Sequence, residues 1–231
     1  MRSQIQESSG FPGCVRFLDG MDIVLQHSLS YYGKTYFNHK KRYALNIQGI
    51  CDANRRFAFI SGSFLSSVSD ATVFGETSLF KLPNLFFSSP DEYVLADKAY
   101  RVTRHCMTPY KEPLASREAG GYCEFNLHLA EAQIKIEHAF VVLKNRWGSL
   151  KGISVYGRRV KDHVRVVAWI LSCIVLHNFL CDFEHDEEWV ASLGRQEAEE
   201  GFEEYEVIGE EAERQAGSER RHQMREYFFN Q

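Results

Sequence analysis

The chain has 231 residues, of which 44% are hydrophobic, 25% charged and 13% aromatic, the composition of a globular protein with a substantial core. No run of eighteen apolar residues occurs and the first thirteen residues lack the apolar segment of a signal peptide, so we expect a protein that is neither secreted nor inserted in a membrane. The six cysteines lack the spacing of zinc ligands or of a disulfide framework, which indicates small core residues in a reducing compartment.

The net charge of −4 is unevenly distributed along the chain. Residues 184–231 carry 15 acidic and 5 basic residues, whereas residues 1–183 carry 16 acidic and 22 basic ones. A basic body with an acidic tail is typical of a nucleic-acid binder, although a solvated surface with a disordered end explains the same counts. We therefore expect a loose segment at 1–12, one domain at 13–183, and an acidic tail at 184–231 that is disordered or partly helical.

The first half of the domain predicts an antiparallel meander of three strands. The strands are expected at residues 14–26, 43–51 and 57–64, with a turn at 52–55, and the first carries an acidic residue near its end. Ser69-Asp70 then predicts the N-cap of a helix.

The second half predicts one more strand and two long helices. The strand covers residues 92–96 and ends at Asp97, and the helices are expected at about 126–147 and 160–182, the last one amphipathic and buried. This order of elements indicates an α/β fold with a mixed sheet flanked by helices.

Three acidic residues occupy positions that a solvated surface charge would not explain. Asp19 and Asp97 each follow an apolar strand segment, where an open sheet presents its chemistry. Glu137 lies among the apolar residues of IKIEHAF, and burying an acid there costs several kcal/mol unless it is coordinated or paired. The Glu137 carboxylate could be stabilised either by a metal ion or by an ion pair with a lysine or arginine, and the sequence leaves both alternatives open. Hard cations such as Mg²⁺ prefer carboxylate oxygens, and two ions about 4 Å apart can activate a water and stabilise a leaving oxygen.

Seven stretches around these acids resemble the DDE endonuclease domain of Harbinger-type transposases and their domesticated relatives. In chain order they are FLDGMDI, YALNIQGICDANRRF, SSVSDATVF, YVLADKAY, MTPYKEP, IKIEHAFVVLKNRW and VLHNFL. The resemblance implies an RNase H-like sheet, a three-strand antiparallel meander with further strands, flanked by helices. It implies that Asp19, Asp97 and Glu137 are catalytic, and that these three and Asp70 bind divalent cations, two Mg²⁺ or Mn²⁺ ions. DNA is the implied substrate.

The sequence departs from the family pattern at a few positions. Lys98 follows Asp97 where the family usually has serine, Ser69 stands where a histidine often precedes Asp70, and Asp22 stands where many relatives have histidine. The helical region that usually precedes the catalytic domain is not matched, so we expect a separate partner protein to supply sequence-specific DNA binding.

The expected function is that of a divalent-metal-dependent DNA endonuclease or transposase catalytic domain, which hydrolyses phosphodiester bonds with a metal-activated water. The alternative is a domesticated, catalytically silent module that binds DNA or protein. We expect a nuclear or cytoplasmic protein, and an oligomer is compatible with the sequence. An enzyme that acts on RNA fits the seven stretches less well.

Basic residues supply candidates for phosphate contacts, since phosphate charge dominates affinity for DNA. They are Lys34, Lys40, Lys41, Arg42, Lys144 and Arg146, with Lys111 and Lys151 as further candidates. A soluble basic loop explains the run at 40–42 equally well. His177-Asn178 lies on an apolar helix, which favours a hydrogen-bonded core pair over a catalytic role.

Overall fold

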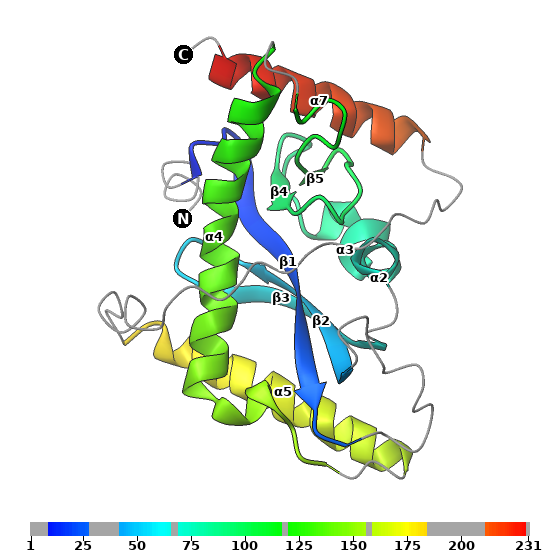
Figure 1. Cartoon of the computed structure of the whole chain (residues 1–231), viewed down its shortest axis with the longest axis vertical. Helices are drawn as coiled ribbons and strands as arrows, with labels where there is room; N and C mark the ends of the chain where they lie inside the picture. The colour runs from blue at the N-terminus through cyan, green and yellow to red at the C-terminus, as the bar shows by residue number, and fades with distance from the viewer. Residues whose placement is uncertain are drawn as a thin grey trace.

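A five-stranded mixed sheet forms the centre of the molecule (Figure 1). The computed structural model describes residues 9–27, 42–65, 69–116, 120–155, 159–183 and 211–229. The strands are β1 (Cys14–Leu25), β2 (Tyr43–Cys51), β3 (Phe57–Leu65), β4 (Tyr93–Ala96) and β5 (Cys106–Met107). Their order is β3-β2-β1-β4-β5, with β1, β2 and β3 antiparallel and β4 parallel to both β1 and β5. The meander and the mixed sheet are confirmed, as expected for an RNase H-like fold.

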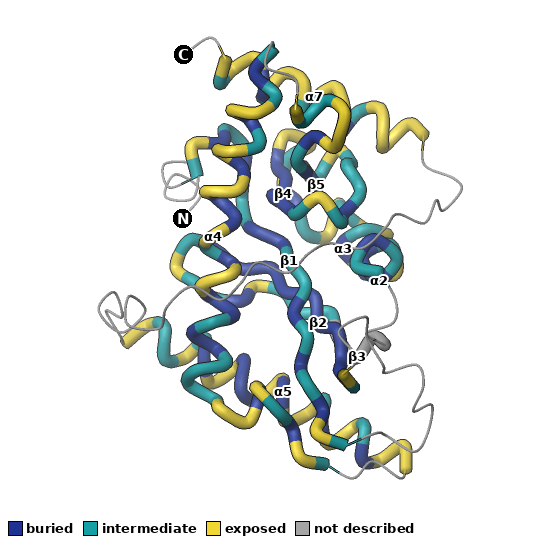
Figure 2. The backbone as a smooth tube through the Cα atoms, in the orientation of Figure 1, coloured by how far each residue is buried: buried dark blue, intermediate teal, exposed yellow. Residues whose placement is uncertain are grey.

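Helices cover both faces of this sheet (Figure 1). They are α2 (Asp70–Glu76), α3 (Ser78–Lys81), α4 (Tyr122–Arg146), α5 (Val160–Leu180) and α7 (Glu211–Phe229), with short 3-10 turns η2 (Pro83–Leu85) and η3 (Gly148–Lys151). The long helix α4 contacts β1, β2 and β4, α5 contacts β3 and α4, and α2 contacts β2. Because both faces are covered, strands β2 and β4 are almost continuously buried (Figure 2).

The two faces of β1 belong to two different hydrophobic clusters. Phe17, Met21 and Ile23 lie in the cluster that includes the buried side chains of α4 and α5. Leu18 lies in the second cluster, with Phe74 of α2. Since successive side chains of a strand point to opposite faces, Asp19 belongs to the α4 side and Gly20 to the α2 side of the sheet.

The prediction that Glu137 is buried among apolar residues was wrong. The buried stripe of α4 includes Leu129, Ile136, Phe140 and Leu143, at helical spacing. Glu137 lies one residue, about 100° of helix rotation, beyond Ile136 and is exposed. It is therefore not embedded among apolar side chains; it lies at the flank of the stripe.

Helix α5 is amphipathic, as expected, but buried on one side only. Its inner face contributes Val166, Ile170 and Cys173 to the core, whereas Val164 and Phe179 are among several large apolar residues exposed on the outer face. By length and composition alone the helix would also be apolar enough to cross a membrane. Its inner face packs on β3 and α4.

His177 and Asn178 form the core pair expected from the sequence. Arg146 donates to His177 Nδ1 at 3.1 Å, so His177 Nε2 carries the proton that it donates to the carbonyl of Arg55 at 2.9 Å. Asn178 Oδ1 accepts from the backbone N–H of Phe57 at 2.8 Å, and its Nδ2 donates to the carbonyl of the same residue at 2.7 Å. Both residues thus join α5 to the start of β3.

The two ends of the chain meet on the domain, which the sequence did not predict. Residues 1–8 lie outside the described residues, but Phe11, expected in a loose segment, is fully buried and packs against Phe125 and Phe228. Within the acidic tail, α7 forms a helix that contacts α4 and β5. Gly217 lets α7 approach closely, since a Cβ there would lie 2.3 Å from the carbonyl carbon of Thr103.

The cysteines are all free in the structure. Cys14, Cys51, Cys106 and Cys173 are buried, Cys181 is half-buried and Cys123 is exposed. Cys173 is therefore the small core residue expected from the sequence, whereas Cys181 lies at the rim of the core beside Arg146.

Candidate active site

Asp19 and Asp97 lie side by side because of how two parallel strands end. The pairing of β1 with β4 stops at Leu18 opposite Ala96, so the next residue on each strand is an aspartate. Asp97 follows the last residue of β4 as expected. Asp19, by contrast, is in the middle of β1, which continues to Leu25 paired with β2 alone. The expectation that Asp19 ends its strand was wrong; what ends there is the neighbouring strand.

Asp70 reaches this point from the α2 side of the sheet. Ser69 caps the helix by accepting a hydrogen bond from the N–H of Thr72 at 3.3 Å, as the sequence predicted, and Asp70 is the first helical residue. Asn46 Nδ2 donates to Asp70 Oδ1 at 2.8 Å, and Gln48 Nε2 donates to the Asp70 carbonyl at 2.9 Å. Two amides of β2 therefore fix both the helix start and its carboxylate.

Gly20 provides the space that Asp70 occupies. A Cβ at position 20 would lie 2.7 Å from Asp70 Oδ1 and 3.1 Å from its Cγ. Any other side chain at this position would push the carboxylate away from β1. Gly20 therefore has a steric role, because the absence of a side chain leaves room for the carboxylate of Asp70, fifty residues later in the sequence.

Electrostatics joins the four acids into one cluster. Burial raises the pKa of Asp19 well above its ordinary value, and the charges of Asp70, Asp97 and Glu137 raise it further. A hydrogen bond from the N–H of Gly20, at 2.7 Å, acts in the opposite direction. The four acids come from β1, α2, the end of β4 and α4, and all of them influence the charge at Asp19.

Glu137 approaches from α4, opposite Asp70. Glu137 is exposed as a whole residue, but surrounding atoms partly desolvate its carboxyl group and raise the pKa of that group. The charge of Asp97 raises the pKa of Glu137 further. In the part of the chain that is described, no cation acts on this pKa. The ion pair that the sequence left open for Glu137 is therefore not seen within that part.

The donor chemistry of the cluster fits a divalent cation, although its oxygens are dispersed. Within the described ranges, no three His, Cys, Asp or Glu side chains gather closely enough to hold a metal ion. However, the four carboxylates, three of which raise the pKa of Asp19 by their charges, are the hard oxygen donors that Mg²⁺ or Mn²⁺ prefers. Three further oxygens beside Asp70, namely Asn46 Oδ1, Gln48 Oε1 and the Tyr100 hydroxyl, are buried without a hydrogen-bond partner among the described residues. These three oxygens beside Asp70 therefore have hydrogen-bonding or metal-binding capacity that no described residue uses.

Asn46, Gln48 and Tyr100 were not among the residues predicted for the site. A signal for the two amides was present, since both stand in the strand YALNIQGIC, whose other residues are apolar or glycine except for Tyr43 at its start. Buried amides of this kind need partners, so they indicate a polar structure next to the strand. Here that partner is Asp70.

The basic residues proposed for phosphate binding have different surroundings. Lys34, Lys40 and Lys41 lie outside the described residues. Arg42 is exposed and Lys144 half-buried, and both make contacts of their own. Arg146 points into the domain, where it donates to His177, so its guanidinium has a structural partner. Lys98 is exposed, and its backbone N–H donates to Asp97 Oδ1 at 2.5 Å.

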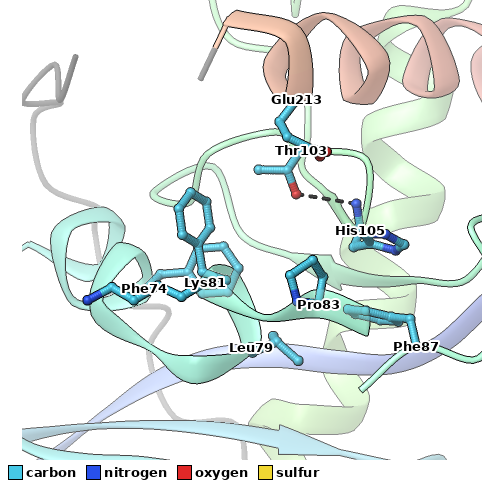
Figure 3. A pocket seen from close by; sticks show the side chains of 9 residues that line it. Phe74, Leu79, Lys81, Pro83, Phe87, Thr103, His105 and Glu213 are labelled. Atoms are coloured by element: carbon cyan, nitrogen blue, oxygen red, sulfur yellow. Dashed lines mark hydrogen bonds between the residues drawn. The ribbon is translucent and has the colours of Figure 1, made fainter. Parts of the chain in front are cut away.

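A further pocket has a volume of about 230 Å³, and Figure 3 shows the side chains that line it. It is lined by Phe74, Leu79, Phe80, Lys81, Pro83, Phe87, Thr103, His105 and Glu213. The ring of His105 stacks on Phe87 with centroids 4.4 Å apart, and the backbone N–H of His105 donates to the Thr103 hydroxyl at 3.3 Å. None of the four carboxylates lines this pocket, so it does not belong to the candidate active site.

The fold and the site define an α/β domain whose acids meet where a parallel strand pair ends. The chain belongs to the DDE superfamily endonucleases, since the family model matches residues 18–178. An Arabidopsis thaliana relative named Protein ALP1-like is 24% identical over 198 residues, which cover 80% of this chain and 47% of that protein. The chain therefore spans about half the length of this curated relative. No solved structure matches the chain significantly.

Proposed function

We propose that this chain is the catalytic domain of a divalent-metal-dependent DNA endonuclease of the transposase type. The observation that carries the proposal is the placement of three acids: Asp19 and Asp97 directly follow the last residues that pair β1 with β4, and the Asp70 carboxylate lies against Gly20. Besides burial, the charges of Asp70, Asp97 and Glu137 raise the pKa of Asp19. Keeping several like charges together in a partly buried site is unfavourable unless a cation compensates them. Membership of the DDE superfamily endonucleases supports the same reading.

The residues of the cluster would divide the work as follows. Asp19, Asp97 and Glu137 would hold the cations, Mg²⁺ or Mn²⁺ and two in number, with Asp70 as an additional ligand. Bound cations would activate the attacking water and stabilise the leaving oxygen of a phosphodiester. Asn46 holds the Asp70 carboxylate in place, and the N–H groups of Gly20 and Lys98 orient those of Asp19 and Asp97.

DNA is the substrate that the family implies, and the charge of the domain supports it. Residues 1–183 carry 22 basic and 16 acidic residues. We propose that Arg42 and Lys144, together with Lys34, Lys40 and Lys41, contact phosphates, because such contacts supply most of the affinity for DNA. A separate protein is proposed to supply sequence-specific binding, and the nucleus is the proposed location.

Nicking of supercoiled plasmid in Mg²⁺ or Mn²⁺ tests the enzymatic function. We expect the wild-type chain to convert plasmid to open circles only when the cation is present, and Asp97→Asn to be inactive. Asp91→Asn offers a control, since Asp91 is an exposed aspartate just before the start of β4 and contacts Arg220 of α7 at 3.1 Å. A wild type no more active than Asp97→Asn would contradict the proposal.

A catalytically silent module that binds DNA or protein is the second candidate. The observation that favours it is the dispersion of the acids, since no three potential ligands within the described ranges gather at metal-binding distance. In that case binding of DNA would persist in EDTA while nicking is absent under all conditions. The same plasmid assay, combined with a DNA-binding measurement in EDTA, separates the two candidates.

A further inference from the structure

Tyr100 lies three residues after Asp97, on the face of the sheet that α2 covers. Its backbone N–H donates to the carbonyl of Asp97 at 3.1 Å, and its ring packs edge-on against Phe74 of α2 with centroids 5.6 Å apart. The residue is only 1% exposed. Because β4 and α2 hold the ring from two directions, the position of its hydroxyl is fixed as well.

The Tyr100 hydroxyl is buried without a hydrogen-bond partner in the described part of the chain. Leaving a buried hydroxyl unpaired costs about 1 to 3 kcal/mol, so such a group in a native structure needs a reason. After burial, the charges of Asp70 and Asp19 are the strongest influences that raise its pKa. A tyrosine hydroxyl holds its proton at neutral pH, so it is available as a hydrogen-bond donor.

Asp70 is the acceptor that the geometry favours. It lies one helical turn before Phe74, the side chain against which the Tyr100 ring packs, and Asn46 already donates to its Oδ1. We propose that Tyr100 is a positioning residue, whose hydroxyl donates a hydrogen bond to the Asp70 carboxylate when the acids hold a divalent cation. Asn46 and Tyr100 then orient this carboxylate from two sides, as second partners commonly orient metal ligands. The inference rests on the proposed metal-dependent function.

Tyr110 offers a matched control for removal of a single hydroxyl. Its side chain is also buried, and its hydroxyl likewise has no hydrogen-bond partner of normal geometry. Its ring, however, lies under the guanidinium of Arg221, 4.2 Å from the ring centroid. No acid influences the pKa of Tyr110, which burial raises and Arg221 lowers. Tyr110→Phe therefore deletes the same atom in a similar environment, away from the carboxylates.

The test compares the full-length wild type, Tyr100→Phe and Tyr110→Phe by thermal unfolding in EDTA and by calorimetric titration with Mn²⁺ alone. We expect both variants to be at least as stable as the wild type in EDTA, because each loses an unpaired buried hydroxyl. The dissociation constant for Mn²⁺ should rise about tenfold in Tyr100→Phe and remain unchanged in Tyr110→Phe, since one charge-assisted hydrogen bond is lost.

Three results would overturn this inference. Tyr100→Phe that binds Mn²⁺ like the wild type contradicts the role of the tyrosine but leaves the proposed function intact. Tyr100→Phe that unfolds in EDTA assigns the hydroxyl to folding rather than to the site. A wild type that does not respond to Mn²⁺ contradicts the proposed function and the inference together.

Discussion

Substitution of Gly20 by alanine perturbs the candidate active site without touching any of its acids. The new Cβ would lie 2.7 Å from Asp70 Oδ1, and ordinary contact begins at 3.4 Å, so the carboxylate must withdraw by about 0.7 Å. That oxygen accepts a hydrogen bond of 2.8 Å from Asn46, which the withdrawal weakens. A hydrogen bond to a charged group contributes about 1.5 to 3 kcal/mol, so we expect a loss of about 1 to 3 kcal/mol in unfolding free energy.

The effect of Gly20→Ala on activity should exceed its effect on folding. A misplacement of about 1 Å in an active site can lower the rate about a hundredfold, so we expect Mn²⁺-dependent plasmid nicking to fall by about ten- to a hundredfold. Urea unfolding and the nicking assay measure the two quantities separately.

Gly75→Ala is the control, since Gly75 lies on the same helix as Asp70 and nothing lies within 4 Å of its added Cβ. Alanine should stabilise this helix by about 0.5 to 1 kcal/mol and leave nicking unchanged. If Gly20→Ala retained wild-type stability and nicking, the reasoning about the space for Asp70 would be refuted.

Three further predictions concern stability. Since burial raises the pKa of Asp19 in the folded state, the native chain binds more protons than the unfolded chain above about pH 4. The contribution of Asp19 to stability in EDTA is therefore complete below that pH and is lost as the pH rises through the folded pKa. The difference in unfolding free energy between the wild type and Asp19→Asn, measured in urea at a series of pH values, should fall with pH; a difference independent of pH would contradict the assignment. Asn178→Ala should lower the unfolding free energy by about 2 to 4 kcal/mol, because the N–H and the carbonyl of Phe57 both lose their partner, and a loss below about 1 kcal/mol in urea unfolding would be too small. Gly217→Ala places a Cβ 2.3 Å from the Thr103 backbone, so α7 should detach and exchange its amide hydrogens faster, while exchange in β1 and β2 stays slow.

Most of the fold could be predicted from local patterns. Strands β1, β2 and β3 and helix α5 begin at the expected residues, because apolar spacing and turn residues are properties of neighbouring positions. Helix α4 begins at Tyr122, four residues earlier than expected, after Gly121 in a left-handed conformation with φ of 71°. The two-residue strand β5 is too short to produce a pattern, and it forms because β4 supplies its hydrogen bonds.

The tail was expected to be disordered or partly helical, but the docking of α7 on the domain could not be predicted because it depends on distant contacts. Its sequence is strongly polar, so its composition favours disorder. In the structure Arg221 lies over the ring of Tyr110, Arg225 lies 4.5 Å from the ring centroid of Tyr122, and Phe228 packs against Phe11. These partners are more than ninety residues away in the sequence, and no local pattern reveals them.

The acids of the candidate site were predicted from strand ends and from the family resemblance, but their neighbours follow only from the tertiary structure. The sequence could place Asp97 at the end of a strand, but only the pairing of β1 with β4 shows that Asp19 is its neighbour. The prediction that Glu137 is buried was wrong because a shift of one residue along a helix moves a side chain about 100° around the axis. The amide of Asn46 that holds Asp70 lies on another strand, 24 residues earlier.

The most direct test of the central claim compares Glu137→Gln with Glu131→Gln in Mn²⁺-dependent plasmid nicking. Both residues are exposed on α4, so neither substitution should alter folding, and only Glu137 shares the charge environment of Asp97 and Asp19. We predict that Glu137→Gln abolishes nicking while Glu131→Gln nicks at the wild-type rate. Equal nicking by the two variants would contradict the assignment of a four-acid metal site to this domain.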